Sequence, residues 1–435
     1  MSFKSNCGRS LTRAVSAAIT AVVAVLMAVS SATTAKSSTF TSLHDFCTKA
    51  SRCKDGSSPR GPVLTDSNGN IYGTTSGGGK HNAGTVFMMS PDGTFKVLHD
   101  FCSKQACADG DAPLSPLVLD VNGNLYGTTL QGGNGGSGGG VAFELSPSPD
   151  RTVWTLITLH TFGTVGGDGA SPRDGLTYQG ASTGALYDGT SPLYGSAIWG
   201  GANGYGAVFQ LTYVAGHKTR DVKTIYSFCS LSNCTDGQQP NGALIGTPDG
   251  KLYGVTALGG AAGAGVLFEV ASDTGAETVL HSFCQGDCAD GDIAVGSLAV
   301  DPTGNIFGTT ERDALGQERG TIYKLIPNGT RSKLSVLYTF CSLDSCGDGF
   351  YPYGVVRDTG GNLYVTTVGG GAHNRGDIFE LSGKNGTVLY SFCADQLCQS
   401  GDRSVGLTID GNGNLLGATS EYGKHGGGNV FRLTP

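Results

Sequence analysis

The sequence predicts an all-β protein folded as a seven-bladed β-propeller with four antiparallel strands per blade. Self-similarity with a period of roughly 50–65 residues is typical of repeat folds, in which each unit buries its apolar faces against its neighbours. No segment after residue 35 keeps a 3.6-residue apolar period long enough for a helix. A strand of the form aliphatic-[His/Tyr]-x-Phe recurs seven times and ends at Phe46, Phe101, Phe162, Phe228, Phe283, Phe340 and Phe392.

Residues 116–162 show how one unit divides into four short strands. The expected strands are 116–120, 125–129, 141–145 and 152–162, and turns rich in Gly, Asn, Asp and Pro separate them. In the recurring turn Asp-x-x-Gly-Asn, Asp accepts backbone hydrogen bonds and Gly takes the positive φ. We expect the aromatic residue that follows this turn to fill the space between neighbouring sheets. The Gly after it is expected to let the adjacent sheet approach closely.

The two ends of the repeat region predict that the ring closes. The first repeat strand, 39–46, is a fourth strand without preceding partners, and 429–433 is a third strand without a successor. Seven complete blades therefore require the N-terminal strand to complete the last blade, which removes the exposed sheet edges. A linear β-solenoid would need atypical capping units, and none is visible. Eight or six blades are the alternative counts.

Residues 1–35 are predicted to be a secretory signal peptide. Three cationic residues precede the apolar run 14–29, and small residues follow it. A membrane anchor is the alternative, but the run is short for a span. We assign 36–435 to the propeller, expect no membrane span after signal removal, and expect an exported protein in the periplasm or outside the cell. A net charge of −7 before that removal argues against nucleic-acid partners.

Cysteines occur in pairs directly after six of the seven repeat phenylalanines, and the third unit lacks both members. Paired presence and paired absence predict six local disulfides in an oxidising compartment. Zinc is the competing interpretation, but no pair has a histidine partner at zinc-finger spacing. The predicted pairs are Cys47–Cys53, Cys102–Cys107, Cys229–Cys234, Cys284–Cys288, Cys341–Cys346 and Cys393–Cys398.

An Asp-Gly turn, mostly followed by Pro, comes after six of the seven units and joins each fourth strand to the next first strand. One hypothesis is a ring of carboxylates around the central opening that holds a sugar or a cation such as calcium. The other is a repeated turn that aims the next inner strand. The carboxylates are Asp55, Asp109, Asp168, Asp236, Asp290 and Asp348.

Histidines in the glycine-rich loops form a second candidate set. His81, His373 and His425 belong to blades one, six and seven, which ring closure makes neighbours. An imidazole cluster there would favour a transition metal. The histidines of the repeat strands, such as His99, occupy a position that holds tyrosine in other blades. This exchange indicates a side chain that packs through its ring and keeps a polar group at its end. The predicted first strands carry no converging His/Glu/Arg set of the kind that propeller enzymes need.

At these motifs the chain resembles the GloVer tandem-repeat family of secreted bacterial proteins. The shared patterns are D-G-x-x-P, D-x-x-G-N-L-Y-G-T-T-x-x-G-G and G-x-V-F-x-L, and together they cover nearly all of 39–435. The resemblance implies a β-propeller-like exported protein without an established activity, often with a C-terminal surface anchor. No such anchor is visible here, so we expect release into the periplasm or the medium.

These observations favour a monomeric, non-enzymatic binding or scaffold propeller. Its expected partner is an extracellular protein or a polysaccharide, engaged through the loops that carry the disulfides. No cofactor is predicted. The alternative is a metal-dependent propeller enzyme of the lactonase or polysaccharide lyase type, with its site in the central channel.

Overall fold

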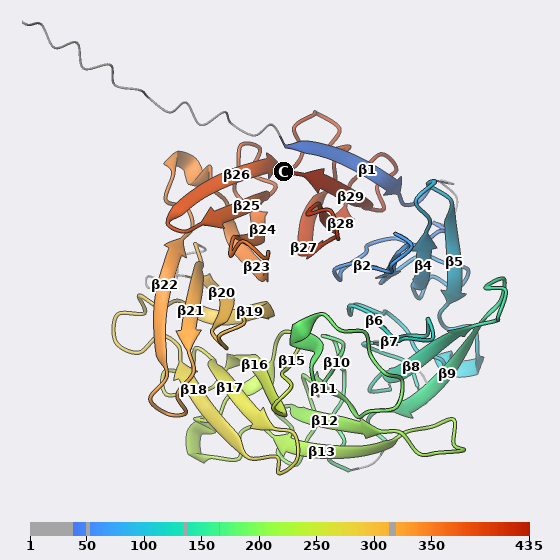
Figure 1. The fold of residues 1–435 in the computed structure, drawn as a ribbon, viewed down its shortest axis with the longest axis horizontal. Helices are drawn as coiled ribbons and strands as arrows, with labels where there is room; N and C mark the ends of the chain where they lie inside the picture. Colours follow the sequence, from blue (N-terminus) through green and yellow to red (C-terminus); the bar gives the residue numbers. More distant parts are fainter. Residues whose placement is uncertain (1–37, 49–52, 134–137, 165, 313–318) are drawn as a thin grey trace, which may run out of the picture. The chain divides into compact units, whose positions relative to one another are not determined.

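A computed structural model describes residues 38–48, 53–133, 138–164, 166–312 and 319–435. The predicted signal peptide lies outside the described residues. The unit Ser38–Pro435 contains seven antiparallel sheets arranged around a central axis, which confirms the predicted propeller (Figure 1). The described residues contain four short 3-10 turns and no α-helix.

The first four blades each run from an inner strand at the axis to an outer strand. In blade four the inner strand is divided into two pieces, β14 and β15. The strands are β2 (Leu64–Thr65), β3 (Ile71–Thr75), β4 (Thr85–Met89) and β5 (Phe95–Asp100) in blade one; β6 (Val118–Leu119), β7 (Leu125–Thr128), β8 (Val141–Pro147) and β9 (Trp154–Thr161) in blade two; β10 (Leu176–Tyr178), β11 (Leu193–Ala197), β12 (Ala207–Thr212) and β13 (Asp221–Ser227) in blade three; and β14 (Gln238–Pro240), β15 (Ile245–Gly246), β16 (Lys251–Leu258), β17 (Val266–Ala271) and β18 (Glu277–Ser282) in blade four.

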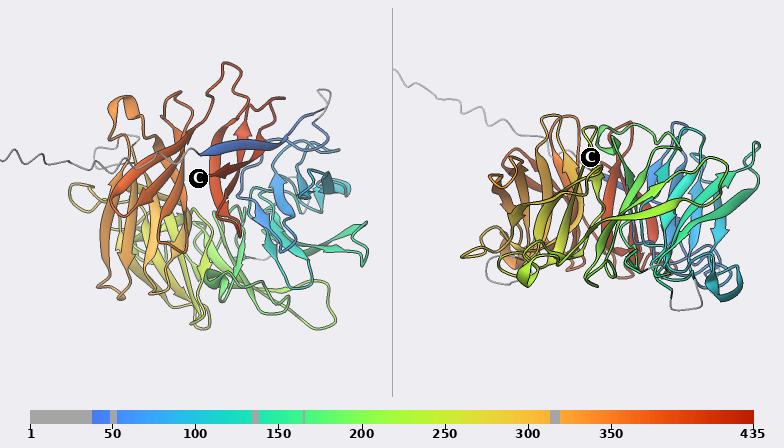
Figure 2. Two further views of the ribbon diagram at one scale, coloured as in Figure 1. Left: turned by 45° about the horizontal axis from the view of Figure 1, so that its top comes forward. Right: turned by 90° about the horizontal axis from the view of Figure 1, so that it is seen from below.

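The remaining blades repeat this order, and the last one is completed by the first strand of the chain. Figure 2 shows the strands of each blade running between two opposite faces, where the connecting loops gather. The strands are β19 (Asp292–Val300), β20 (Ile306–Arg312), β21 (Thr321–Ile326) and β22 (Lys333–Thr339) in blade five; β23 (Phe350–Arg357), β24 (Leu363–Gly369), β25 (Asp377–Ser382) and β26 (Asn385–Ser391) in blade six; and β27 (Asp402–Ile409), β28 (Leu415–Glu421), β29 (Asn429–Thr434) and β1 (Thr39–Asp45) in blade seven.

Pairing of β1 with β29 closes the ring, as predicted. The two strands are antiparallel and place Ser42 opposite Phe431 and Asp45 opposite Asn429. Figure 1 shows β1 alongside β29, although these strands come from opposite ends of the sequence. The chain then continues into blade one through Phe46, which is fully buried. Closure therefore pairs the outer edge of the last sheet with a strand from the other end of the chain.

The apolar cores lie between neighbouring blades. The Phe that closes one blade packs its ring against the aromatic residue of the next blade's third strand, with ring centroids 5.2 Å apart for Phe101 and Phe143 and 5.0 Å apart for Phe228 and Phe268. All four rings are completely buried. This contact explains the recurrence of Phe, because an aromatic pair adds stabilisation to the burial of its surface.

The aromatic residue of the second strand also packs between blades, as expected. Tyr72 of blade one is buried in a cluster with Leu125 of blade two, and its hydroxyl donates to Asp66, 3.1 Å away. The expectation for the following glycine is wrong. A Cβ on Gly73 would lie 2.6 Å from the ring of Phe87, the residue paired with it on the third strand of the same sheet. The absence of a side chain at Gly73 therefore leaves room for the Phe87 ring of the same blade.

All six predicted disulfides are present. Each closes a short loop between a fourth strand and the next first strand, and both of its cysteines have positive φ, for example 57° at Cys102 and 51° at Cys107. The third unit has Gly163, with φ 74°, at the position of the first cysteine. Left-handed backbone is strained for residues other than glycine, so the disulfide and the glycine are two ways to hold the same turn.

We predict that the intact protein without its first 35 residues has no titratable thiol. Its twelve cysteines are all consumed by the six disulfides. Thiol titration under denaturing conditions checks this before and after reduction, with the expected rise from none to twelve. Several free thiols in the unreduced protein would contradict the disulfide assignment. Reduction is also expected to lower the melting temperature, since each short loop contributes roughly 2 kcal/mol in the chain-entropy model.

One buried carboxylate distinguishes blade six from the others. Asp377 begins the third strand, where blade one has Thr85 and blade seven has Asn429. Its side chain is completely buried; Oδ1 accepts from the Ser391 hydroxyl at 2.6 Å, whereas Oδ2 has no hydrogen-bond partner. Burial raises the pKa of Asp377 to about 7.

We predict that Asp377→Asn stabilises the protein more strongly as pH rises. The unfolded chain ionises this carboxyl near pH 4, but the folded protein keeps it neutral until pH approaches 7, so wild-type stability falls across that interval and then levels off. The advantage of the variant should grow by about 1–3 kcal/mol between pH 5 and pH 8. Urea unfolding at both pH values measures it. Equal stability differences at the two pH values would show that Asp377 does not titrate as described.

Candidate functional site

The carboxylates of the Asp-Gly turns accept backbone hydrogen bonds from the loop that connects each fourth strand to the next first strand. Asp109 is completely buried and accepts from the backbone N–H of Ser103 at 3.0 Å and of Lys104 at 3.1 Å. The ring of His99, on the preceding strand β5, lies 3.2 Å away. The equivalent histidine–aspartate pairs are His44–Asp55, His160–Asp168 and His281–Asp290.

Tyrosine replaces histidine in two further blades without changing this arrangement. The Tyr226 hydroxyl donates to Asp236 at 2.7 Å, and the backbone N–H of Ser230 donates to the same carboxylate at 2.8 Å. Burial raises the pKa of Asp236, but these donated hydrogen bonds outweigh it and hold the pKa below its usual value. Tyr338 and Asp348 repeat the pair at 2.7 Å. These carboxylates therefore form their hydrogen bonds with groups in their own loops and the preceding strand.

The three loop histidines are exposed and lie in separate connections. His81 lies between β3 and β4, His373 between β24 and β25, and His425 between β28 and β29. The described part of the chain contains no group of three or more His, Cys, Asp or Glu residues placed to hold a metal ion.

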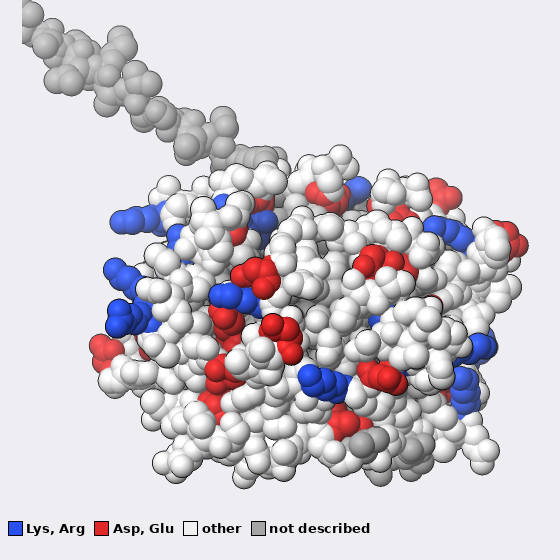
Figure 3. All heavy atoms as spheres, turned by 60° about the horizontal axis from the view of Figure 1, so that its bottom comes forward, with Lys and Arg blue, Asp and Glu red and all other residues white. Residues whose placement is uncertain are grey.

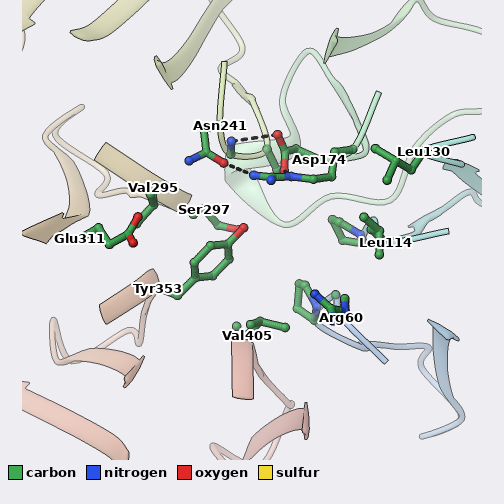
Figure 4. Close-up of a pocket in the computed structure, with 18 residues that line it drawn as sticks. Arg60, Leu114, Leu130, Asp174, Asn241, Val295, Ser297, Glu311, Tyr353 and Val405 are labelled. Atoms are coloured by element: carbon green, nitrogen blue, oxygen red, sulfur yellow. Dashed lines mark hydrogen bonds and ion pairs between the residues drawn. The ribbon is translucent and has the colours of Figure 1, made fainter. Parts of the chain in front are cut away.

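A pocket of about 420 Å³ lies in the central channel and is named here the channel pocket. Its lining includes Leu130 and Glu311 at the ends of second strands, next to the glycine-rich loops. Those loops share a face with the disulfide loops, because Gly79 donates to the carbonyl of Cys53 at 2.9 Å. We call this face the disulfide face. Every blade contributes to the lining, at Arg60, Leu114, Arg173, Asn241, Val295, Tyr353 and Val405 (Figure 4).

A repeated backbone feature positions these pocket residues. Two residues before each of them, the chain adopts a positive φ, for example 52° at Ser58, 55° at Gln239 and 55° at Tyr351. The N–H of Gln239 donates to the carbonyl of Tyr205, in the glycine-rich loop of the preceding blade, at 2.8 Å. Equivalent bonds connect blades one, two, three and five to the blade before each of them, and they account for a conformation that such residues rarely adopt.

The inner strands of neighbouring blades approach each other closely at the pocket. A Cβ on Gly242 would lie 2.2 Å from the carbonyl oxygen of Gly296, and one on Gly296 would lie 2.3 Å from the nitrogen of Gly354. Glycine is required here because backbone meets backbone. Blade three has Asp174 at this position, and its carboxylate accepts from the N–H of Gly242 at 3.0 Å.

Asp174 also fixes the central arginine. Its carboxylate lies 3.2 Å from Nε of Arg173, and Nη2 of Arg173 donates to the side-chain oxygen of Asn241. The neighbouring charge of Asp174 raises the pKa of Arg173. Burial, with a further contribution from Asp174, raises the pKa of the Tyr353 phenol, so the hydroxyl is neutral and can donate or accept. Charged and neutral hydrogen-bonding groups are therefore held in place within one pocket.

The other side of the pocket is largely apolar. Leu114, Pro116 and Leu130 of blade two and Val405 of blade seven contribute to its lining. Arg60 lies among them, and Figure 4 places it across the opening from Asp174 and Asn241. The pocket therefore combines a polar half with an aliphatic half, the usual composition of a small-molecule site.

Sequence reasoning missed this site because it searched the interior of each first strand. The pocket residues instead lie just before the segments predicted as first strands, and they follow the Pro of Asp-Gly-x-x-Pro in five blades, as in Pro59-Arg60 and Pro172-Arg173. In the structure the first strands of blades five, six and seven begin earlier than predicted and include Val295, Tyr353 and Val405. A usable signal was available. The position between the recurring Pro and the small residue that usually follows holds a different residue type in different blades. Such variation at one position of a repeat is expected where the repeats together form a binding site.

Charged side chains of both signs are interspersed on the side of the molecule drawn in Figure 3. Within the described residues, no helix has the length and hydropathy needed to cross a membrane.

The fold and the pocket define a seven-bladed β-propeller with a concave site in its channel. The model of the Gloeobacter/Verrucomicrobia repeat matches residues 28–191 and 181–347, and the chain belongs to that family.

Solved structures similar to this chain include a gluconolactonase from Xanthomonas campestris, with 13% identity over 91% of this chain and 89% of that one and a TM-score of 0.39. TolB from Acinetobacter baumannii is 11% identical over 85% and 78% of the two chains, with a TM-score of 0.38. A luciferin-regenerating enzyme is 15% identical over 73% and 90%, with a TM-score of 0.39. No curated protein matches the sequence.

Proposed function

We propose that this protein is an exported, non-enzymatic binding propeller that holds the end of a polysaccharide chain in the channel pocket, approached from the disulfide face. One observation carries the proposal. All seven blades direct a residue into a single cavity of about 420 Å³, and these residues include charged, amide, phenolic and aliphatic side chains, such as Arg173, Asn241, Tyr353 and Val405.

The form of the pocket favours a saccharide over a protein partner. A concave site encloses a small ligand or a chain end, whereas protein interfaces are usually broad and nearly flat. The amide of Asn241 and the carboxylate of Glu311 offer planar hydrogen-bonding groups, and Tyr353 adds a ring with a polar tip. Sugar hydroxyls need such donors and acceptors, and their C–H faces need the aliphatic wall.

Rigid support strengthens this proposal. In blades one to five the pocket residues follow turns that hydrogen bonds attach to the preceding blade, and six disulfides close the neighbouring loops. A preorganised site loses little conformational entropy on binding. Six disulfides are also typical of proteins in oxidising compartments, in line with the proposed export.

A glycan array with the purified protein, followed by calorimetric titration of the best ligand, tests the proposal. We expect Tyr353→Ala to weaken binding at least tenfold, about 1.4 kcal/mol. A matched control is Tyr213→Ala, because Tyr213 is exposed and follows β12 outside the pocket lining. Capture of an extracellular protein with no glycan binding would overturn the saccharide assignment. A stoichiometric metal ion together with hydrolysis or cleavage of a ligand would support the metal-dependent enzyme instead.

A further inference from the structure

We infer that the channel pocket recognises an acidic sugar residue and that Arg60 binds its carboxylate. The inference rests on the proposed function, because it assigns a charge to the saccharide that the pocket would hold. It begins from the different surroundings of the two arginines in the lining, Arg60 and Arg173.

Arg60 is the arginine whose charge is uncompensated. Its side chain is exposed, and it has no hydrogen bond or ion pair with any residue that the structure describes. Arg173, by contrast, is paired with Asp174 and bonded to Asn241. A guanidinium presents a planar set of donors that matches a carboxylate with two parallel hydrogen bonds. Arg60 is therefore free to receive an anion from solution.

The surroundings of Arg60 strengthen such an ion pair. Pro62, Leu114, Pro116 and Val405 form the adjoining part of the pocket and carry no charge. Apolar walls lower the local dielectric, so a charge pair formed there is stronger than one on an open surface. The same walls can cover the C–H face of a pyranose ring.

The opposite half of the pocket suits the hydroxyl groups of the same sugar. Glu311, Ser297 and Asn241 line that half, and Figure 4 places Glu311 across the opening from Arg60. A ligand carboxylate at Arg60 would therefore lie away from the Glu311 carboxylate. A uronic acid, which has one carboxylate and several hydroxyls on an otherwise apolar ring, matches this distribution.

Calorimetry with oligogalacturonate and with a neutral galactose oligosaccharide of equal length tests the inference. We expect the wild-type protein to bind the acidic chain at least tenfold more tightly, with an affinity that falls as salt increases. Arg60→Gln should remove this preference and the salt dependence. Arg60→Lys should retain part of both, because it keeps the charge without the bidentate geometry. Arg331→Gln is the matched control, since Arg331 is exposed in the turn between β21 and β22.

The possible results separate the inference from the proposed function. Equal affinity for both oligosaccharides, unchanged in Arg60→Gln, would overturn the inference and leave a saccharide-binding propeller. Binding of neither oligosaccharide, nor of any other glycan, would overturn both. Thermal melting of Arg60→Gln checks the fold, and we expect no change because the side chain is exposed and unpaired. A lower affinity of Glu311→Gln for both oligosaccharides would support the assignment of the hydroxyl-binding half.

Discussion

Deletion of residues 38–46 is expected to abolish cooperative folding of the propeller. It removes β1, the outer partner of β29, and the ring of Phe40, which stacks on Tyr390 at 4.2 Å and lies 5.3 Å from Phe431. It also removes the buried Phe46. Loss of a buried Phe costs about 3–5 kcal/mol, and domains are typically stable by only about 5–15 kcal/mol. Thermal melting followed by circular dichroism measures the effect.

Point variants grade the same effect. Phe46→Ala should lower the unfolding free energy by about 3–5 kcal/mol, and Phe46→Leu by less because it leaves a smaller cavity. Thr39→Ala is the control, since Thr39 begins β1 with an exposed side chain. A deletion variant that melts at the wild-type temperature would show that β1 is not needed for the ring. Two independent transitions in that variant would instead show that the blades fold without closure.

Asp236→Ala is expected to cause the second-largest loss of stability, about 3–5 kcal/mol, because it leaves several buried hydrogen-bond donors unsatisfied, each at a cost of about 1–3 kcal/mol. The carboxylate is completely buried and accepts from the Tyr226 hydroxyl, from Ser230 and from the N–H of Leu231. Its removal leaves these donors without an acceptor inside the protein. Urea unfolding at neutral pH measures the loss.

The acid side of the stability profile provides an independent check. The pKa of Asp236 is below its usual value in the folded protein, so its contribution is present above about pH 4 and is lost as pH falls through the folded-state pKa. The profile of Asp236→Ala should therefore be flatter under acid conditions. A profile parallel to that of the wild type would contradict this account.

Blade seven suggests a conservative variant for this network. There Ser400 replaces the aspartate and accepts from the N–H of Cys393 at 2.9 Å. Asp236→Ser should thus lose less stability than Asp236→Ala. Asp92→Ala, in the exposed turn between β4 and β5, is the control for removal of a carboxylate and is expected to change little. Equal losses for Ala and Ser would show that hydrogen bonding does not explain the effect.

Backbone hydrogen bonds connect a disulfide loop to the channel pocket. Cys102 donates its N–H to the carbonyl of Gly110 within the disulfide loop, and Ala112 donates to Ala83 of the preceding blade. Leu114 enters the pocket two residues later. Leu114 is thus placed by a short hydrogen-bonded segment, which explains how a loop can present a stable binding site.

Local sequence patterns were sufficient to predict the blades, the strand order and the disulfides. The Asp-x-x-Gly-Asn turns, the alternation of Phe143 and Leu145, and the paired cysteines act over a few residues, where turn chemistry and strand period decide the structure. The ring closure was predictable as well, because each end of the repeat region has a strand without a neighbour and the two strands can pair with each other. The role of Gly73 was misjudged, because the Phe87 ring that it accommodates comes from the paired strand rather than from the next sheet.

The sequence by itself determined which segments become strands, how many blades form and how the ends meet, because these depend on short-range patterns repeated seven times. Only the tertiary structure decided what the side chains at the channel do. Arg60, Tyr353 and Val405 are far apart along the chain and meet because the ring brings their inner strands to one axis. Asp236 and its counterparts, by contrast, are satisfied by groups close in sequence within their own loops, such as the N–H groups of Ser230 and Leu231. Which polar groups face a ligand depends on long-range packing, and no local pattern encodes it.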